Sequence, residues 1–506
     1  MNEQVYTAAF PFGGCGGGAL GFLNASVTML GTRASFRLTG GVDFDAGACK
    51  DFEYLTGVPE ACADVDSMTT ADFRRAMGER APDVIFMSPP CKGSSKLLSG
   101  ELAKTEKYQN MNRLAGTFVR KMLLAWSEPP RLVLFENVPN ITTRAADVIV
   151  EVTELLEAAG YIVSSGFHEC GEIGGLAQKR KRFLMVARHK QRAAHILYHP
   201  PIKRIRGCGE VLGTIPVPGA GGGPMHIMPN VSWLTWVRLA LIPAGGDWRD
   251  IPGVLGEGQP RREVFRRHRV ESWHEPSCTI GGPGSNGPTA VADPRPEALD
   301  PRLTCTPRAG TYGVLHWTEA AATITAAMQI DNGKAAVADP RVERAYDHGY
   351  AVLHWQEPSP TVAAGSHPGQ GAYSVADPRQ GLQGAFSVPD DPRKPPSATP
   401  VIVAADGTWH RPLTVLELAA LQGFPTTLRG APLHLSGSAT TWREHIGNAV
   451  PPPAAQAIAE KMLVTLLASD ASSFVLDGGG AVWVEAPDMI EPGFVRYAHH
   501  HQELHA

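Results

Sequence analysis

The first 190 residues alternate short apolar runs with stretches of helical periodicity, and this alternation restricts the fold more than any other feature. The apolar runs are "QVYTAAFPF", "SFRLTGGVDFD", "PDVIFMSPPC" and "PRLVLFENV". Helical spacing appears in "MNRLAGTFVRKMLLAW" and "AADVIVEVTELLEAAGY". Strands alternating with helices predict an α/β fold, a doubly wound and mostly parallel sheet covered on both faces. Ligands of such sheets bind beyond the carboxyl ends of the strands, where the polar residues of these runs fall.

Length and composition indicate a soluble protein of two or more domains. The chain has 506 residues, of which 43% are hydrophobic and 19% charged. It contains no apolar run of about 18 residues and no basic, apolar leader at its N-terminus, so we expect an intracellular protein that makes no membrane contact. The eight cysteines are scattered without a CxxC pair, and we expect no metal site.

The charge distribution is more informative than the net charge of -4. Residues 173 to 209 contain ten Lys or Arg and no acid, and "RREVFRRHR" (261 to 269) forms a second basic cluster. Either cluster alone fits a solvated face. Two clusters in one region also fit a surface that binds a polyanion.

Beyond residue 190 the chain becomes rich in Pro and Gly and contains an internal repeat. The units "WHEPSCTI" (273 to 280), "WTEAAATI" (317 to 324) and "WQEPSPTV" (355 to 362) are each followed by "VADPR", at a spacing of about 40 residues. We interpret each unit as short strands packed around Trp273, Trp317 or Trp355. Such a region is a β-rich scaffold, a surface that presents loops to a partner, or both. Helical patterns return at 412 to 424 and 452 to 468.

A glycine-rich loop and a series of acids favour a nucleoside cofactor. "FGGCGGGALGF" follows the first strand and lets backbone N–H groups approach a ligand, although a tight turn looks similar. Asp43 and Asp45 end the second strand, where a carboxylate can accept hydrogen bonds from ribose hydroxyls, and Asp64 is placed to meet an adenine amino group. Each acid taken alone also fits a turn or a helix cap.

Cys91 leaves a buried strand directly after Pro89 and Pro90. A lone cysteine at such a place is more often a small core residue. Two further strand ends favour a chemical role, because "LVLFENVPN" ends with Glu136 and "AQKRKRFLMVA" begins with Arg180 and Arg182. A thiol, a carboxyl group and an arginine pair at one sheet edge suit attack on an electron-poor ring.

These segments together resemble the DNA cytosine-5 methyltransferases. "FGGCGG" is similar to the family's cofactor loop, "PPC" to its Pro-Cys motif, "ENV" to its Glu-Asn-Val motif and "QKRKR" to QxRxR. "RPLTVLELAALQGFP" (411 to 425) and "GNAVPPPAAQAIA" (447 to 459) resemble its last two blocks. The six blocks stand in the family's order. The segment between "QKRKR" and "RPLTVLELAALQGFP" is where the family has its target recognition domain, and here it holds the Trp repeats.

The resemblance implies a covalent mechanism that uses S-adenosyl-L-methionine and leaves S-adenosyl-L-homocysteine. Cys91 would add to C6 of a flipped cytosine, Glu136 would bind N3 and the exocyclic amine, and Arg182, with Arg180, would hold O2 and a phosphate. By motif position, the cofactor pocket would be formed by Phe12, Gly13, Gly14, Gly16, Gly17, Asp43, Asp64, Pro90, Leu114 and Asn448.

The predicted organisation has four parts and two predicted DNA-contacting regions. A catalytic domain spans 1–190 and resumes at 408–468, with a recognition domain at 191–407 and a C-terminal extension at 469–506. DNA contacts are expected from residues near the thiol and in the second basic cluster, namely Lys92, Ser94, Arg261, Arg262, Arg266 and Arg267.

Some positions depart from the family pattern. Phe10 stands where the family often has an acid, and Lys92 stands where it usually has Gln. Lys92 would lower the pKa of Cys91 or bind a backbone phosphate, and Asp43 replaces the more frequent Glu.

The resemblance predicts an enzyme acting on double-stranded DNA, monomeric and located in the cytoplasm of a bacterium or a phage-infected host. A cognate restriction endonuclease is a candidate partner. Two alternatives stay open at this point. One is a catalytically silent DNA-binding or regulatory relative, and the other is an RNA cytosine-5 methyltransferase. The long repeat-bearing segment favours duplex DNA, because reading bases in a groove needs an extended surface.

Overall fold

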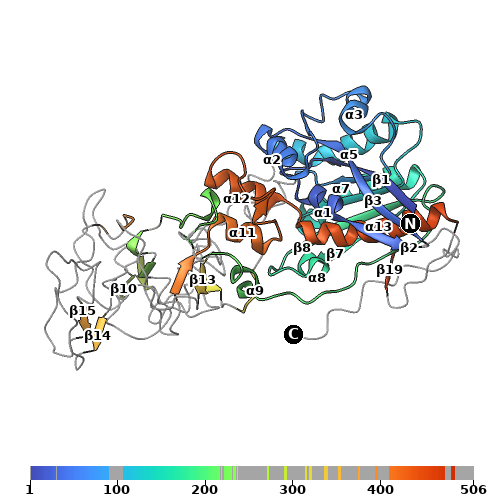
Figure 1. The fold of residues 1–506 in the computed structure, drawn as a ribbon. Helices are drawn as coiled ribbons and strands as arrows, with labels where there is room; N and C mark the ends of the chain where they lie inside the picture. The colour runs from blue at the N-terminus through green and yellow to red at the C-terminus, as the bar shows by residue number, and fades with distance from the viewer. Residues whose placement is uncertain are drawn as a thin grey trace.

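The computed structural model describes residues 2–29, 31–90, 106–216, 221–230, 409–472 and 480–484, with short stretches between 218 and 396. Among these residues, eight strands form one sheet in the order β2-β3-β1-β5-β6-β8-β7, with β4 beside β3 (Figure 1). The strands are β1 (Asn2–Pro11), β2 (Ser26–Met29), β3 (Thr32–Asp43), β4 (Ala61–Cys62), β5 (Val84–Met87), β6 (Leu132–Asn137), β7 (Tyr161–Glu169) and β8 (Lys181–His189). β4, β3, β1, β5 and β6 run parallel, whereas β2, β7 and β8 are antiparallel to their neighbours. The predicted mostly parallel α/β sheet is thus confirmed.

The central strands are buried on both faces because their side chains alternate between two apolar cores. In β5, Val84 and Phe86 belong to a first core, and Ile85 and Met87 belong to a second core on the opposite face. The first core is completed by α1 (Gly17–Asn24) and α13 (Pro452–Asp470), and the second by α3 (Thr70–Met77), α5 (Glu106–Ala125) and α7 (Ala146–Ala158). The amphipathic helices expected around 111–126 and 145–161 are therefore present, as is the helix expected at 452–468.

Local sequence sets where several helices begin. α2 (Ala46–Thr56) starts at Asp45, whose side chain accepts hydrogen bonds from two backbone N–H groups, and it ends at Gly57 in the left-handed conformation. α11 (Val415–Leu421) starts with a capping box formed by Thr414 and Glu417. α12 (Ala439–Asn448), which the sequence did not predict, is capped by Ser438.

A third core joins segments that are far apart in sequence. It contains Leu212 of α9 (Cys208–Leu212), Met225 of η2 (Pro224–His226), Ala321, many residues of α11, and Ile446 of α12. Earlier in the chain, Leu197 of β9 (Leu197–Tyr198) belongs to the first core, so the chain still packs on the eight-stranded sheet beyond residue 190. The domain boundaries stay predictions.

Each Trp repeat contains a pair of parallel strands. The pairs are β10 (Val270–Ser272) with β11 (Ala290–Ala292), β12 (Val314–Leu315) with β13 (Ala336–Asp339), and β14 (Val352–His354) with β15 (Ser374–Ala376). The register is the same in all three, since the leading valine lies opposite the residue that precedes the valine of "VADPR". β13 also pairs with β16 (Trp409–Pro412). The three tryptophans predicted as anchors lie outside the described residues. The strands that precede them in sequence are described.

Residues 482–484, in the predicted C-terminal extension, pack against the first core. β19 (Val482–Val484) pairs with β9, and Trp483 is 4% exposed in the first core. Its indole stacks on His199, with ring centroids 4.8 Å apart, and contacts His168 of β7 at 5.0 Å. No helix in the part of the chain that the structure describes is both long and apolar enough to cross a bilayer.

This contact makes a pH-dependent contribution to stability. Burial, followed by the charge of His199, lowers the pKa of His168 to about 4. In the unfolded chain this histidine binds a proton near the ordinary pKa of about 6.5. The contribution of neutral, buried His168 to stability is therefore fully present above that pH and is lost as the pH drops toward 4. We expect His168 to account for about 2 kcal/mol of the unfolding free energy lost between pH 7 and 5. Urea unfolding of His168→Gln should lack this part of the loss, and the exposed control His434→Gln should keep it.

Candidate active site

The carboxyl ends of the parallel strands bring most of the predicted site residues to one edge of the sheet. Along β4, β3, β1, β5 and β6 these ends lead to Asp64, Asp43, Phe12, Pro90 and Glu136, respectively. These residues therefore form a row along the edge. At one end are the acids predicted to bind the cofactor, and at the other is the carboxyl group predicted to bind the cytosine.

The glycine-rich loop is shaped by close approaches that exclude side chains. Phe12, at φ 56°, adopts the left-handed conformation, as does Gly16 at φ 88°. For a residue other than glycine this conformation costs on the order of 1–3 kcal/mol. A Cβ atom on Gly17 would lie 2.6 Å from the carbonyl oxygen of Val450, so the last sequence block packs directly on this loop. The Phe12 ring packs edge-on against Phe118 of α5.

Asp43 links the glycine-rich loop to the end of β3. Its Oδ2 accepts a hydrogen bond from the Gly14 N–H at 3.0 Å, and its Oδ1 accepts one from the Asp45 N–H at 3.0 Å. A carboxylate has about four acceptor positions, so both oxygens keep capacity for a ligand hydroxyl. Burial raises the pKa of Asp43, against the lowering effect of these N–H groups. Asp45, in contrast, uses its side chain to cap α2.

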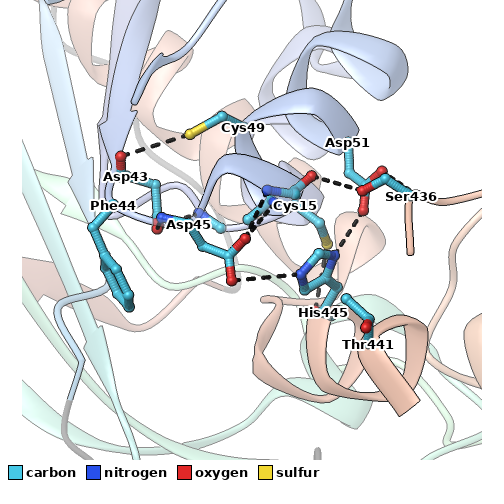
Figure 2. Close-up of polar contacts among 12 residues, drawn as sticks. Cys15, Asp43, Phe44, Asp45, Cys49, Asp51, Ser436, Thr441 and His445 are labelled. Carbon is cyan, nitrogen blue, oxygen red and sulfur yellow. Dashed lines mark hydrogen bonds and ion pairs between the residues drawn. The ribbon is translucent and has the colours of Figure 1, made fainter. Parts of the chain in front are cut away.

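Phe44 lies between these two acids and was missed in the sequence reasoning. The residue is 58% exposed. In Figure 2 its ring points away from the side chains of Asp45 and His445. The backbone carbonyl groups of Asp43 and of Phe44 itself each accept a hydrogen bond from a thiol. Cys49 Sγ donates to Asp43 O at 3.6 Å, and Cys62 Sγ donates to Phe44 O at 3.7 Å. An aromatic residue between two acids at a strand's carboxyl end was the signal available in "GVDFD".

Glu60 is a second residue that the sequence reasoning missed. Both carboxyl oxygens are buried, close to the Cys49 thiol and the Gly13 backbone N–H. Burial, followed by the nearby charge of Asp43, raises its pKa to about 9, so the group is neutral at pH 7. A side chain on Gly13 would overlap this carboxyl group.

The structure also describes the remaining predicted cofactor residues. Asp64 is exposed and accepts a hydrogen bond from the Asp66 N–H at 3.0 Å. Leu114 of α5 packs on the second core, and Asn448 is exposed at the end of α12. Pro90 lines a small pocket together with Pro89, Ala115 of α5 and Asn137 of β6. This pocket connects the Pro-Cys turn, α5 and the Glu-Asn-Val motif.

Glu136 and Arg182 form a buried ion pair across adjacent strands. Arg182 Nε lies 2.9 Å from Glu136 Oε1, and the two side chains are 8% and 7% exposed. The pair forms because β6 ends where the antiparallel β8 begins. Next to it, Asn137 Nδ2 donates to the Pro89 carbonyl at 3.0 Å. The Glu-Asn-Val motif therefore holds both the arginine and the chain that leads into Cys91.

Arg180 has surroundings other than those we expected. It is fully buried, and its Nη2 donates to the carbonyl oxygens of Gly447 at 2.9 Å and Ala449 at 2.8 Å. Gln422 Nε2 donates to Ala449 O as well, at 2.8 Å. Burial lowers the pKa of Arg180 to about 9. In this position Arg180 joins the QKRKR block to the last two blocks, and its predicted contact with substrate stays a prediction.

Only some of the basic side chains of residues 173–209 are exposed at the surface. Arg180, Arg182 and Arg188 are buried, and the exposed Arg204 is paired with Glu210 at 2.7 Å. The predicted nucleophile and DNA contacts lie outside the described residues, namely Cys91, Lys92, Ser94, Arg261, Arg262, Arg266 and Arg267. At the other departure from the family pattern, Phe10 packs in the first core, with its ring centroid 5.3 Å from that of Phe22.

Comparison with known families identifies the chain. The model of the C-5 cytosine-specific DNA methylases matches residues 11–206 and 347–464, which is more than half of the chain. The chain belongs to this family. It is a DNA (cytosine-5)-methyltransferase, and the family depends on S-adenosylmethionine. The matched ranges include Glu136, Arg182 and the glycine-rich loop, and the range between them coincides with most of the Trp repeats.

Two curated relatives are similar over more than half of the chain. Type II methyltransferase M1.HphI of Haemophilus parahaemolyticus is 26% identical over 278 residues, covering 54% of this chain and 69% of the relative. Type II methyltransferase M.NgoFVII of Neisseria gonorrhoeae is 25% identical over 306 residues, covering 58% and 74%. Among solved structures, the Entamoeba histolytica methyltransferase EhMeth aligns with a TM-score of 0.47 at 13% identity, covering 92% of this chain and 99% of the other.

Proposed function

We propose that this methyltransferase acts on a cytosine flipped out of double-stranded DNA, through a covalent bond between Cys91 and C6. The observation that carries the proposal is the buried Glu136–Arg182 pair beside the Asn137–Pro89 hydrogen bond. The carboxyl group of Glu136 lies near the end of β6, and the guanidinium of Arg182 lies on the neighbouring β8. The hydrogen bond from Asn137 to Pro89 holds the chain that leads into Cys91. A base within a duplex is out of reach of such a recessed edge, which is the reason for flipping.

The proposed reaction begins when the Cys91 thiolate adds to C6 and forms a C–S bond. The ring electrons move toward N3, where the Glu136 carboxyl group donates a proton, while Arg182 stabilises the O2 oxygen. C5 becomes nucleophilic and would take the methyl group of S-adenosylmethionine, whose S–CH3 bond breaks as S-adenosylhomocysteine leaves. A solvent base would then remove the C5 proton, the electron pair of that C–H bond would re-form the C5–C6 double bond and expel Cys91 as a thiolate, and the N3 proton would return to Glu136. The buried Glu136 carboxyl group needs Arg182 to keep its position when it is charged.

S-adenosylmethionine supplies an electrophilic methyl group when it is bound. The residues at the edge fit its parts. Asp43 has acceptor capacity for ribose hydroxyls, Phe44 offers an exposed ring for the purine, and Asp64 is an exposed acceptor for the exocyclic amine. The acids also suit the positive charge of the sulfonium.

One prediction tests the part assigned to Phe44. Phe44→Ala removes an exposed ring, so we expect little change in stability and a loss of about tenfold in affinity for S-adenosylhomocysteine, consistent with 1–3 kcal/mol for base–aromatic stacking. Phe44→Tyr should keep the affinity. Isothermal titration calorimetry measures both. Equal affinity in Phe44→Ala and the wild type would contradict the assignment.

The proposed function is tested by incubating the full chain with unmethylated duplex DNA and methyl-labelled cofactor. We expect label at C5 of cytosine, and none with a duplex whose cytosines are already 5-methylated. A parallel reaction with tRNA as competitor distinguishes a DNA substrate from RNA. Folded protein that transfers no label to cytosine in any sequence context would refute the proposal.

We further propose that the repeat-bearing segment between the matched ranges is the target recognition domain. Its three strand pairs share one register, which suits repeated presentation of loops to a groove. Both curated relatives are named as type II methyltransferases, which supports a cognate restriction endonuclease as the protein partner.

A further inference from the structure

His445 connects two regions that are nearly four hundred residues apart in sequence. It lies in the last turn of α12, and its ring is 5% exposed (Figure 2). Nδ1 of the ring is 2.7 Å from Oδ2 of Asp51 in α2. The other nitrogen, Nε2, is 4.0 Å from Oδ2 of Asp45, the residue that caps α2. One imidazole thus faces a carboxylate at the start of α2 and another in its second turn.

The pair with Asp51 is built to hold a charge. Asp51 is 2% exposed, and its Oδ1 accepts a hydrogen bond from the Ser436 N–H at 2.6 Å. A buried carboxylate favours a cationic partner, because an uncompensated buried charge is costly. Nε2 of His445 is buried and has no hydrogen-bond partner among the described residues, and Asp45 Oδ2 lies within ion-pair distance of it.

Close packing at Gly47 allows this arrangement. A Cβ atom on Gly47 would lie 3.1 Å from Asp45 Oδ1 and 3.3 Å from Cε1 of His445. Ser436 Oγ donates to the Gly47 carbonyl at 2.9 Å. The first turn of α2 is therefore in direct contact with α12, and it follows immediately after Phe44 and Asp43.

We propose that His445 is a positioning residue for cofactor binding. Its imidazolium, between Asp51 and Asp45, holds the start of α2 and thereby keeps Phe44 and Asp43 in the geometry that receives the nucleoside. The inference rests on the proposed cofactor site. It goes beyond that site because His445 acts through α2 and touches no part of the ligand.

The groups around the ring determine the direction of the pH dependence. The carboxylates of Asp51, Asp45 and Glu444 raise the pKa of His445 more than burial lowers it. The other ionisable neighbour, the Cys15 thiol, donates to the His445 carbonyl, and burial raises the pKa of this thiol, so it stays neutral. We call the contact of the His445 imidazolium with Asp51 and Asp45 the anchor. It is fully formed at low pH and weakens as the pH rises through the pKa of His445.

The experiment measures S-adenosylhomocysteine binding to the full chain by calorimetry between pH 6 and 9. We expect wild-type affinity to fall about tenfold over this range through loss of the anchor, a typical coupling. His445→Gln should bind about tenfold more weakly at pH 6 and equal the wild type at pH 9. The amino group of the probe titrates equally in all variants, so differences between variants report His445. Turnover at saturating cofactor should stay within about twofold of wild type, because the reacting atoms are not touched.

Two further variants separate anchoring from folding. Asp45→Asn keeps the helix cap, since Asn caps as well as Asp, and keeps the Asp51–His445 pair, yet it should lose most of the pH dependence. His434→Gln replaces an exposed histidine of the same segment and should behave as the wild type.

A measurement without cofactor tests independently whether His445 holds the start of α2. In the wild type, amide exchange at Gly47 and Ala48 should be slower at pH 6 than in His445→Gln, after correction for intrinsic rates. Equal protection in the two proteins, or a loss of affinity in His445→Gln that is the same at every pH, would overturn the inference. If exchange changes as expected but the wild type binds no S-adenosylhomocysteine, the proposed cofactor site fails together with the link to it, and the anchor itself stands.

Discussion

Replacement of Cys91 by alanine should reduce methyl transfer by on the order of 10⁴-fold or more, since removal of a nucleophile eliminates the covalent route. Binding of DNA and of S-adenosylhomocysteine should persist, because the substitution leaves the Asn137–Pro89 hydrogen bond and the glycine-rich loop unchanged. The measurement is label transfer to duplex DNA under single-turnover conditions. The calorimetric affinity for S-adenosylhomocysteine serves as the control that the variant is folded.

The same substitution should abolish covalent trapping. In DNA containing 5-fluorocytosine, C5 carries fluorine after methyl transfer and has no proton to lose, so the C–S bond to C6 cannot be released. The wild type should therefore form a complex that survives denaturing electrophoresis, and Cys91→Ala should form none. A trapped complex in Cys91→Ala would assign the nucleophile to another residue.

Replacement of Arg182 by methionine should have the second-largest effect. The change leaves the Glu136 carboxylate buried without its partner, which costs about 3–5 kcal/mol of unfolding free energy. Loss of the guanidinium also removes stabilisation at O2, so we expect turnover to fall about 10²- to 10³-fold. Urea unfolding and single-turnover kinetics measure the two effects separately.

A double variant distinguishes the electrostatic explanation from simple loss of packing. Arg182→Met with Glu136→Gln removes the unpaired charge, so it should be more stable than Arg182→Met alone and yet remain as inactive. The exposed Arg120–Glu151 pair provides a control, since Arg120→Met should cost less than about 1 kcal/mol. If the double variant were no more stable than Arg182→Met, a buried charge would not be the cause.

Much of the fold and of the site's position could be predicted from the sequence. Buried strands alternate along the chain with amphipathic helices, and side-chain periodicity depends only on local geometry. The glycine-rich loop, Asp43 and Glu136 could be placed at one edge because parallel strands end on the same side. The nucleophile and the predicted DNA contacts lie outside the described residues and remain predictions.

The roles of several residues depended on contacts that periodicity does not encode. Arg180 stands two positions from Arg182 in the same motif, yet its guanidinium bonds to carbonyl groups of the last block. Asp45 stands two positions from Asp43, yet it caps a helix. Phe44 was missed because an exposed aromatic ring cannot be distinguished from a buried one in an apolar run.

The sequence alone determined the class of sheet, the edge that carries the chemistry and the family resemblance, because these follow from local periodicity and from short motifs. Only the tertiary structure decided which charges are paired and which face a ligand. His445 meets Asp51 across 394 positions, and Trp483 packs on His168 and His199 after the chain returns from α13. Such contacts arise from the packing of distant segments, and they set burial and local charge, which in turn set protonation.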